Sequence, residues 1–114
     1  MFPSPLRIDD TTDRGWTVLH VAGDLDASTV PALRGRLSDM AAGGPSQVVV
    51  DLSRVTFLDS SGLGALIGGL RRLRSAGGEM RLVPGATPKV RRLLDQTGVG
   101  QLLPIFPTAE AATA

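Results

Sequence analysis

The chain has no cysteine and only one histidine among its 114 residues. Without cysteine it can form no disulfide, no thiolate metal site and no thiol nucleophile. The histidine, His20, lies within an apolar run, where we expect a core or sheet residue rather than a catalytic base. The Gly-x-Ser-x-Gly block of serine hydrolases, a phosphate-binding loop and acidic clusters with metal-ligand spacing are also missing. We therefore expect no enzyme activity, no catalytic residue, no metal and no cofactor.

An excess of charge of one sign is lacking too, because twelve Lys and Arg residues face eleven Asp and Glu residues. The resulting net charge of +1 argues against direct nucleic-acid binding. No apolar run approaches the roughly 18–20 residues needed to cross a bilayer. The segment 1–5 lacks the basic and apolar stretches of a signal peptide. We expect a cytoplasmic protein without a membrane partner.

The length fits one domain, which we expect to span 1–114, with a core over about 6–106. The tail, 107–114, is expected to be frayed or to form a short helix. Apolar periodicity and turn residues predict the order β-β-α-β-α-β-α-β. The expected strands are 6–12, 16–22, 47–52, 80–83 and a short last one at 102–106. The fold class is α/β: a mixed sheet of four to five strands, an initial hairpin then parallel βαβ units, with three to four α-helices.

The stretch Asp59-Ser60-Ser61-Gly62-Leu63-Gly64 joins an apolar run to a helical periodicity. We expect Ser60 to cap this helix and Ser61 to be its first residue. No Glu or Gln follows either serine at the third position, so no capping box would cover the free amides of this terminus. A second loop, Gly23-Asp24-Leu25-Asp26, follows another strand. If the two strands run parallel, both loops leave the same edge of the sheet, where α/β proteins usually bind ligands.

These two loops and the order of elements, over roughly 6–105, resemble the STAS domain of bacterial anti-sigma-factor antagonists. The resemblance implies binding to an anti-sigma factor that is also a serine protein kinase of the histidine-kinase-like ATPase fold, which frees a sigma factor. It also implies that this kinase phosphorylates the second serine, Ser61, and so releases the antagonist, which a serine phosphatase restores. Many members carry glutamate where Asp24 stands.

The resemblance assigns seven further residues to partner binding: Asp24, Asp26, Asp59, Ser60, Gly62, Leu63 and Gly64. A phosphate on Ser61 would add about −1.5 to −2 charges, which the helix N-terminus tolerates within the domain. The same charge beside three carboxylates would weaken an interface selected for a neutral hydroxyl. A local charge would thus release the partner with little change of fold.

Several plainer interpretations stand beside these. Both serines could be simple helix caps, and the three aspartates could be cap or turn residues that brace their loops. For Gly62 and Gly64 we favour partner contact over packing; for Gly68 and Gly69 we favour packing. Asp51 is expected to be structural. The alternative function is a STAS binding or sensor module of a regulatory complex that does not act directly on a sigma-factor switch. A pure scaffold and a choice between monomer and weak dimer also stay open.

Overall fold

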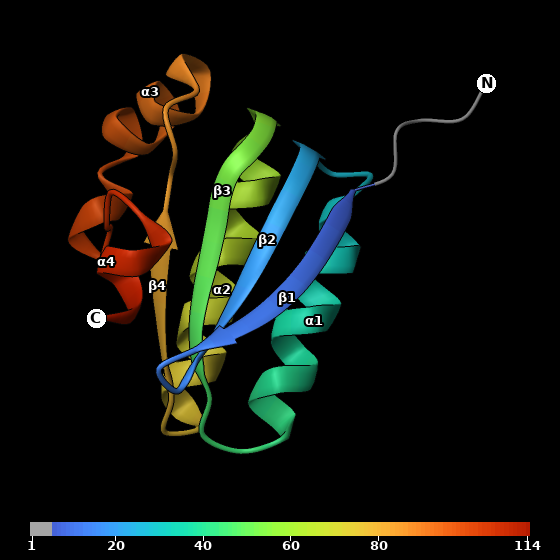
Figure 1. The fold of residues 1–114 in the computed structure, drawn as a ribbon. Coiled ribbons are helices and arrows are strands. Elements are labelled where there is room, and N and C mark those ends of the chain that lie inside the picture. The colour runs from blue at the N-terminus through green and yellow to red at the C-terminus, as the bar shows by residue number, and fades with distance from the viewer. Residues whose placement is uncertain (1–5) are drawn as a thin grey trace.

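A computed structural model describes residues 6–114, so the expected absence of a signal peptide at 1–5 lies outside the described residues. Four strands form one mixed sheet in the order β1-β2-β3-β4. The hairpin strands β1 and β2 are antiparallel, whereas β3 is parallel to both β2 and β4. This arrangement confirms the predicted fold class (Figure 1). The strands are β1 (Arg7–Asp13), β2 (Trp16–Leu25), β3 (Gln47–Leu58) and β4 (Glu79–Val83).

Two helices, α1 and α2, cover one face of this sheet, and the short α4 lies on the opposite face beside β3 and β4 (Figure 1). The helices are α1 (Val30–Ala42), α2 (Ser60–Ser75), α3 (Pro88–Thr97) and α4 (Ala109–Thr113), with a 3-10 turn at Val99–Gln101. Among the helices of the described part, none has the length and apolar character that a bilayer crossing demands.

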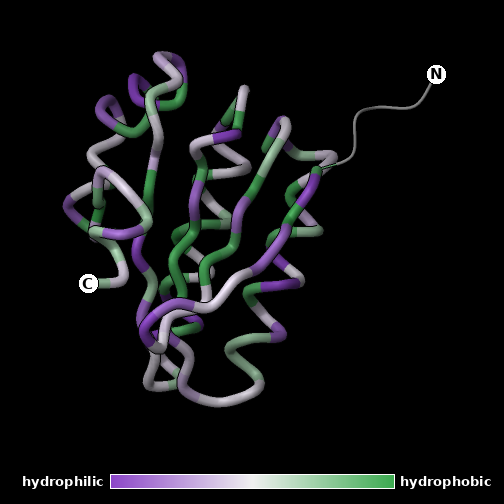
Figure 2. Tube along the Cα trace, viewed as in Figure 1, coloured by the Kyte–Doolittle hydropathy of each residue, from purple (hydrophilic) through white to green (hydrophobic). Residues whose placement is uncertain are grey.

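The consecutive valines of β3 are buried and belong to clusters on both faces of the sheet, as their lack of alternation predicts. Figure 2 shows the hydrophobic stretch of this strand in green. Val48 and Val50 join the main core beneath α1 and α2. Val49 joins a second, smaller cluster with Val18, Val83 and the α4 residue Ala112. The sheet therefore has one face that α1 and α2 cover over its central strands and an opposite face that α4 covers only in part.

Strands β2 and β3 run further than the sequence predicts. Gly23 and Asp24 were expected to break β2, and β3 was expected to stop near Leu52, but the two strands stay paired to Leu25 and Leu58. The pairing survives because β3 accommodates one extra residue after Asp51 and another after Val55, at two irregularities of the β-bulge type. A bulge depends on the neighbouring strand, so the alternation expected along a single strand does not predict it.

The expected last strand at 102–106 is reduced to one parallel bridge between Leu82 and Ile105. Leu82 donates its N–H to the carbonyl of Pro104, and Phe106 donates its N–H to the carbonyl of Leu82, both at 2.8 Å. Pro104 has no N–H and so cannot extend the ladder. The bridge nevertheless occupies part of the outer edge of β4.

The end of the chain forms a short helix, α4, and is anchored to the sheet. The guanidinium of Arg81 donates to the carbonyl of Ala112 at 2.6 Å and lies over the rings of Trp16 and Phe106, 4.2 and 4.9 Å from their centroids. The hydroxyl of Thr113 donates to Asp13 at 3.0 Å. Of the two alternatives for the tail, the structure has the short helix.

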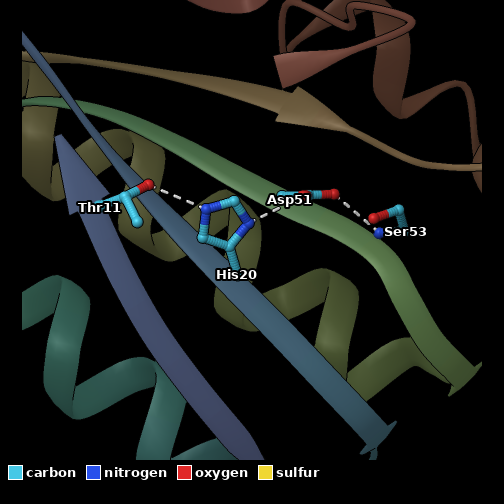
Figure 3. A network of polar contacts seen from close by, with 4 residues as sticks. All are labelled: Thr11, His20, Asp51 and Ser53. Atoms are coloured by element: carbon cyan, nitrogen blue, oxygen red, sulfur yellow. Dashed lines mark hydrogen bonds and ion pairs between the residues drawn. The ribbon is translucent and has the colours of Figure 1, made fainter. Parts of the chain in front are cut away.

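A polar network ties three strands together on the partly open face of the sheet (Figure 3). His20 Nδ1 lies 3.1 Å from the Asp51 carboxylate, and His20 Nε2 lies 2.9 Å from the Thr11 hydroxyl. The other Asp51 oxygen accepts the N–H of Ser53 at 2.9 Å. His20 is thus a sheet residue and Asp51 a structural one, as expected. Because both imidazole nitrogens and both carboxylate oxygens have partners, the network serves to cross-link β1, β2 and β3.

We predict that His20→Ala lowers the free energy of unfolding by about 1–3 kcal/mol, because Asp51 is mostly buried and loses a hydrogen-bond partner. Thr11→Val removes only the more exposed hydrogen bond, so it should lower the free energy of unfolding by at most about 1 kcal/mol. Urea denaturation at neutral pH measures both. Equal stability of His20→Ala and the wild-type protein would contradict a cross-linking role.

Candidate functional site

The carboxyl ends of β2 and β3 bring the two predicted loops together at one edge of the sheet (Figure 1). In the parallel register Asp24 lies opposite Phe57, and Leu25 lies opposite Leu58. The N–H of Asp59 donates to the carbonyl of Leu25 at 3.4 Å and so joins the loop segments directly. The prediction that both acidic loops share one edge is confirmed.

Helix α2 begins one residue earlier than predicted. Its N-cap is Asp59, whose extended backbone lets one carboxylate oxygen accept the N–H groups of Ser61 at 2.9 Å and Gly62 at 3.2 Å. Ser60 is therefore the first helical residue and Ser61 the second, and the prediction that Ser60 caps the helix is wrong. Two amides that were expected to be free are already occupied by a carboxylate.

The two serines differ in exposure. Ser60 is exposed, whereas Ser61 is half-buried at the start of α2. Within residues 6–114 neither hydroxyl makes a hydrogen bond to another protein group. The Ser61 hydroxyl is therefore not sealed in the core, and its role as a phosphorylation site stays a prediction.

Asp26 braces the loop that leads into α1. One of its carboxylate oxygens accepts the Ser28 hydroxyl at 2.7 Å and the N–H groups of Ser28 and Thr29 at 2.9 and 3.2 Å. The hydrogen bond from the Ser28 hydroxyl, aided by these backbone N–H groups, holds the pKa of Asp26 below its ordinary value in spite of some desolvation. Within the domain, Asp26 therefore braces the loop before α1 through these hydrogen bonds.

Asp24 is exposed and is tied to the neighbouring strand. Its carboxylate accepts the hydroxyl of Thr56 at 2.8 Å, and its carbonyl accepts the hydroxyl of Thr29 at 2.7 Å. The ion pairs within residues 6–114 involve carboxylates other than Asp24, Asp26 and Asp59. In the described part of the chain, the negative charge of this edge is therefore not neutralised by direct ion pairing.

The glycines of α2 divide between packing and open surface. Gly62 is buried, and a Cβ there would collide with Leu58 Cδ1 and lie 3.0 Å from the carbonyl oxygen of Leu25. Leu63 is only 6% exposed and belongs to the core. Both positions thus have packing roles, which corrects the preference for partner contact at Gly62. Gly64 faces open space, so partner contact there stays a prediction.

The packing interpretation holds for only one of the next two glycines. A Cβ at Gly69 would collide with the side chain of Leu37 on α1, so this glycine allows the two helices to approach closely. Gly68 instead has nothing within 4 Å of where its Cβ would be, and its expected packing role is wrong. The outward side of α2 is therefore smooth at both Gly64 and Gly68.

Sequence reasoning missed Thr56 and Phe57. Strict alternation along a strand would bury Phe57 together with Val55, but Phe57 is 41% exposed. The second bulge places two residues, instead of one, between the buried Val55 and Leu58. The three-residue spacing of these core positions was the available signal.

We predict that the stabilising effect of Asp26, measured as the difference in unfolding free energy between wild type and Asp26→Asn, depends on pH. The folded-state pKa is lowered, so the ionised form stabilises the fold above the unfolded pKa of about 4. The difference should shrink as pH falls through the folded pKa. Denaturant titrations between pH 7 and pH 2.5 measure it, and a difference that grows on acidification would contradict the brace.

Comparison with known proteins gives this arrangement a family. Residues 7–112 match the family model of the STAS domain. An anti-sigma-B factor antagonist of Staphylococcus aureus is 34% identical over 98 residues, which cover 86% of this chain and 90% of that relative. A crystal structure of an anti-sigma factor antagonist from Mycobacterium paratuberculosis has a TM-score of 0.84 and 31% identity, covering 97% of this chain and 95% of the other. The Bacillus cell fate determinant SpoIIAA in its phosphorylated form has a TM-score of 0.68 and 25% identity, over 93% and 95%. The chain therefore belongs to the STAS domain family, among the anti-sigma-factor antagonists.

Proposed function

We propose that this protein is an anti-sigma-factor antagonist, a regulatory binding protein that frees a sigma factor by binding its anti-sigma factor. The observation that carries the proposal is the accessible Ser61 hydroxyl at the edge where the Asp24 and Asp26 loop meets the start of α2. The antagonist names of relatives that cover most of the chain support it.

The partner in this proposal is an anti-sigma factor that is also a serine protein kinase of the histidine-kinase-like ATPase fold. This kinase phosphorylates Ser61, which weakens its binding to the antagonist, and a serine phosphatase removes the phosphate. The existence of a phosphorylated form of SpoIIAA, a structural neighbour, supports this regulation. The binding surface comprises Ser60 and Gly64, which are exposed, together with Asp24, Asp26 and Asp59.

Because Asp59 caps α2, a phosphate on Ser61 should weaken partner binding more than it would at an uncapped helix N-terminus. The carboxylate already accepts the N–H groups of Ser61 and Gly62, so a phosphate on Ser61 would compete with it for the same donors. A dianion added this close to a carboxylate is repelled by on the order of 1–2 kcal/mol even in water-like surroundings. Burial of the dianion at an interface costs several kcal/mol more, and each 1.4 kcal/mol weakens affinity tenfold.

The alternative is a STAS binding or sensor module in a regulatory complex that does not act on a sigma factor. The accessible Ser61 fits kinase control in both cases. The two functions differ in the consequence of binding. An antagonist displaces a sigma factor from a preformed complex with its anti-sigma factor, whereas a sensor module leaves that complex intact.

We predict that a candidate anti-sigma kinase and ATP add one phosphate to the wild-type protein and to Ser60→Ala, but none to Ser61→Ala. Intact-mass spectrometry measures the gain. Ser61→Asp should bind the kinase at least about tenfold more weakly than Ser61→Ala, because it places a charge where the interface accepts a hydroxyl. Ser75→Asp, at the exposed far end of the same helix, is the matched control and should bind like the wild type.

Phosphorylation of Ser61→Ala, or equal affinities of Ser61→Asp and Ser61→Ala, would contradict the proposed regulation. Release of the sigma factor is followed separately, by gel filtration of the sigma–anti-sigma complex after addition of the antagonist. A complex that stays intact while the antagonist binds would favour the sensor module.

A further inference from the structure

Phe57 exposes an aromatic ring beside the site because of the second bulge in β3. Val55 and Leu58 both point into the core, and the extra residue between them turns Thr56 and Phe57 outward. The Phe57 residue is 41% exposed, one of the few large apolar residues in the described part that are not packed away. Bulges commonly re-aim a side chain at a functional surface.

Asp24 lies opposite Phe57 in the parallel register and presents an oriented carboxylate. The hydroxyl of Thr56 donates to one of its oxygens at 2.8 Å and so restricts the side chain. Among the described residues no ion pair joins this carboxylate to a cation. An ordered carboxylate with an unneutralised charge therefore lies beside an exposed ring.

We propose that Phe57 and Asp24 are the anchor of the partner interface. The partner is a protein surface that offers an apolar pocket to the ring and an arginine or lysine side chain to the carboxylate. This inference rests on the proposed function and deepens it, because it states which chemistry the anti-sigma factor must present. Aromatic residues and arginine–carboxylate pairs dominate the energetics of many interfaces, so the two side chains suit this role.

The anchor and the proposed phosphorylation site lie on one continuous segment. Phe57 precedes the Asp59 cap by two residues and Ser61 by four, at the carboxyl end of β3. A partner seated on the ring would also cover the start of α2, where the phosphate would be added. Thr56 is a positioning residue in this scheme, because it orients the Asp24 carboxylate and does not itself meet the partner's cation.

The test measures the affinity of variants for the anti-sigma kinase that phosphorylates Ser61, by isothermal titration calorimetry. Phe57→Ala should weaken binding at least about tenfold. Leu102→Ala, which truncates a residue that is 54% exposed elsewhere, is the matched control and should bind like the wild type. Phe57→Thr introduces a β-branched residue, which suits a strand, and should reproduce the loss if Phe57→Ala folds poorly. Thermal unfolding of each variant verifies the fold.

The charge of Asp24 is tested through salt dependence. Asp24→Asn should weaken binding several-fold and reduce the fall of affinity with rising salt, whereas Asp39→Asn, an exposed aspartate at the other end of α1, should do neither. Thr56→Val should weaken binding in the wild type but have little further effect in Asp24→Asn, because its role runs through that carboxylate.

The outcomes separate this inference from the proposed function. If the kinase phosphorylates Ser61 but binds Phe57→Ala and Phe57→Thr as tightly as the wild type, the anchor is wrong and the proposed function stands. If the affinities of Asp24→Asn and the wild type depend equally on salt, the proposal that a partner arginine or lysine pairs with Asp24 is wrong. If no candidate kinase binds or phosphorylates the wild-type protein, the proposed function falls and the anchor falls with it.

Discussion

The parallel pairing of β2 with β3 is the constraint on which the whole site depends. Because the two strands run in the same direction, their following loops must emerge at one edge, and the register fixes Asp24 beside Phe57 and Leu25 beside Leu58. The tight approach extends into α2, since Gly62 must lack a side chain to sit against Leu25 and Leu58. A single pairing thus sets the positions of the acidic loop, the exposed ring and the start of the helix.

Within this frame Asp59 links the architecture to its electrostatics. As an N-cap it satisfies two amides of α2, which stabilises the helix by typically about 1 kcal/mol. Its negative charge also occupies the position at which the N-terminus of α2 would otherwise bind an anion. The same carboxylate therefore favours the unmodified serine, and any phosphate added at Ser61 meets a resident negative charge. The proposed phosphorylation of Ser61 would therefore act through the local charge at the start of α2 and would need no large movement of the fold.

The fold and the meeting of the two loops were predictable because they depend on local periodicity and on simple rules of chain direction. The valines of β3 and the helical spacing of α1 carry that information in short windows. The start of α2 was misplaced by one residue because Asp59 and Ser60 are equally good caps by residue type, so only the backbone geometry decides. The exposure of Phe57 was missed because a bulge arises from pairing with a distant strand. The packing role of Gly62 likewise depends on Leu25, which lies far away along the chain.

The two borders of the sheet are closed in different ways. The free side of β4 is partly taken by the Leu82–Ile105 bridge, which leaves little room there for an incoming strand. The free side of β1 carries Asp9, Asp10 and Asp13, each paired with an arginine, and charged side chains on an edge strand discourage pairing with another strand. Association by continuing the sheet from one molecule into the next is therefore disfavoured at both borders.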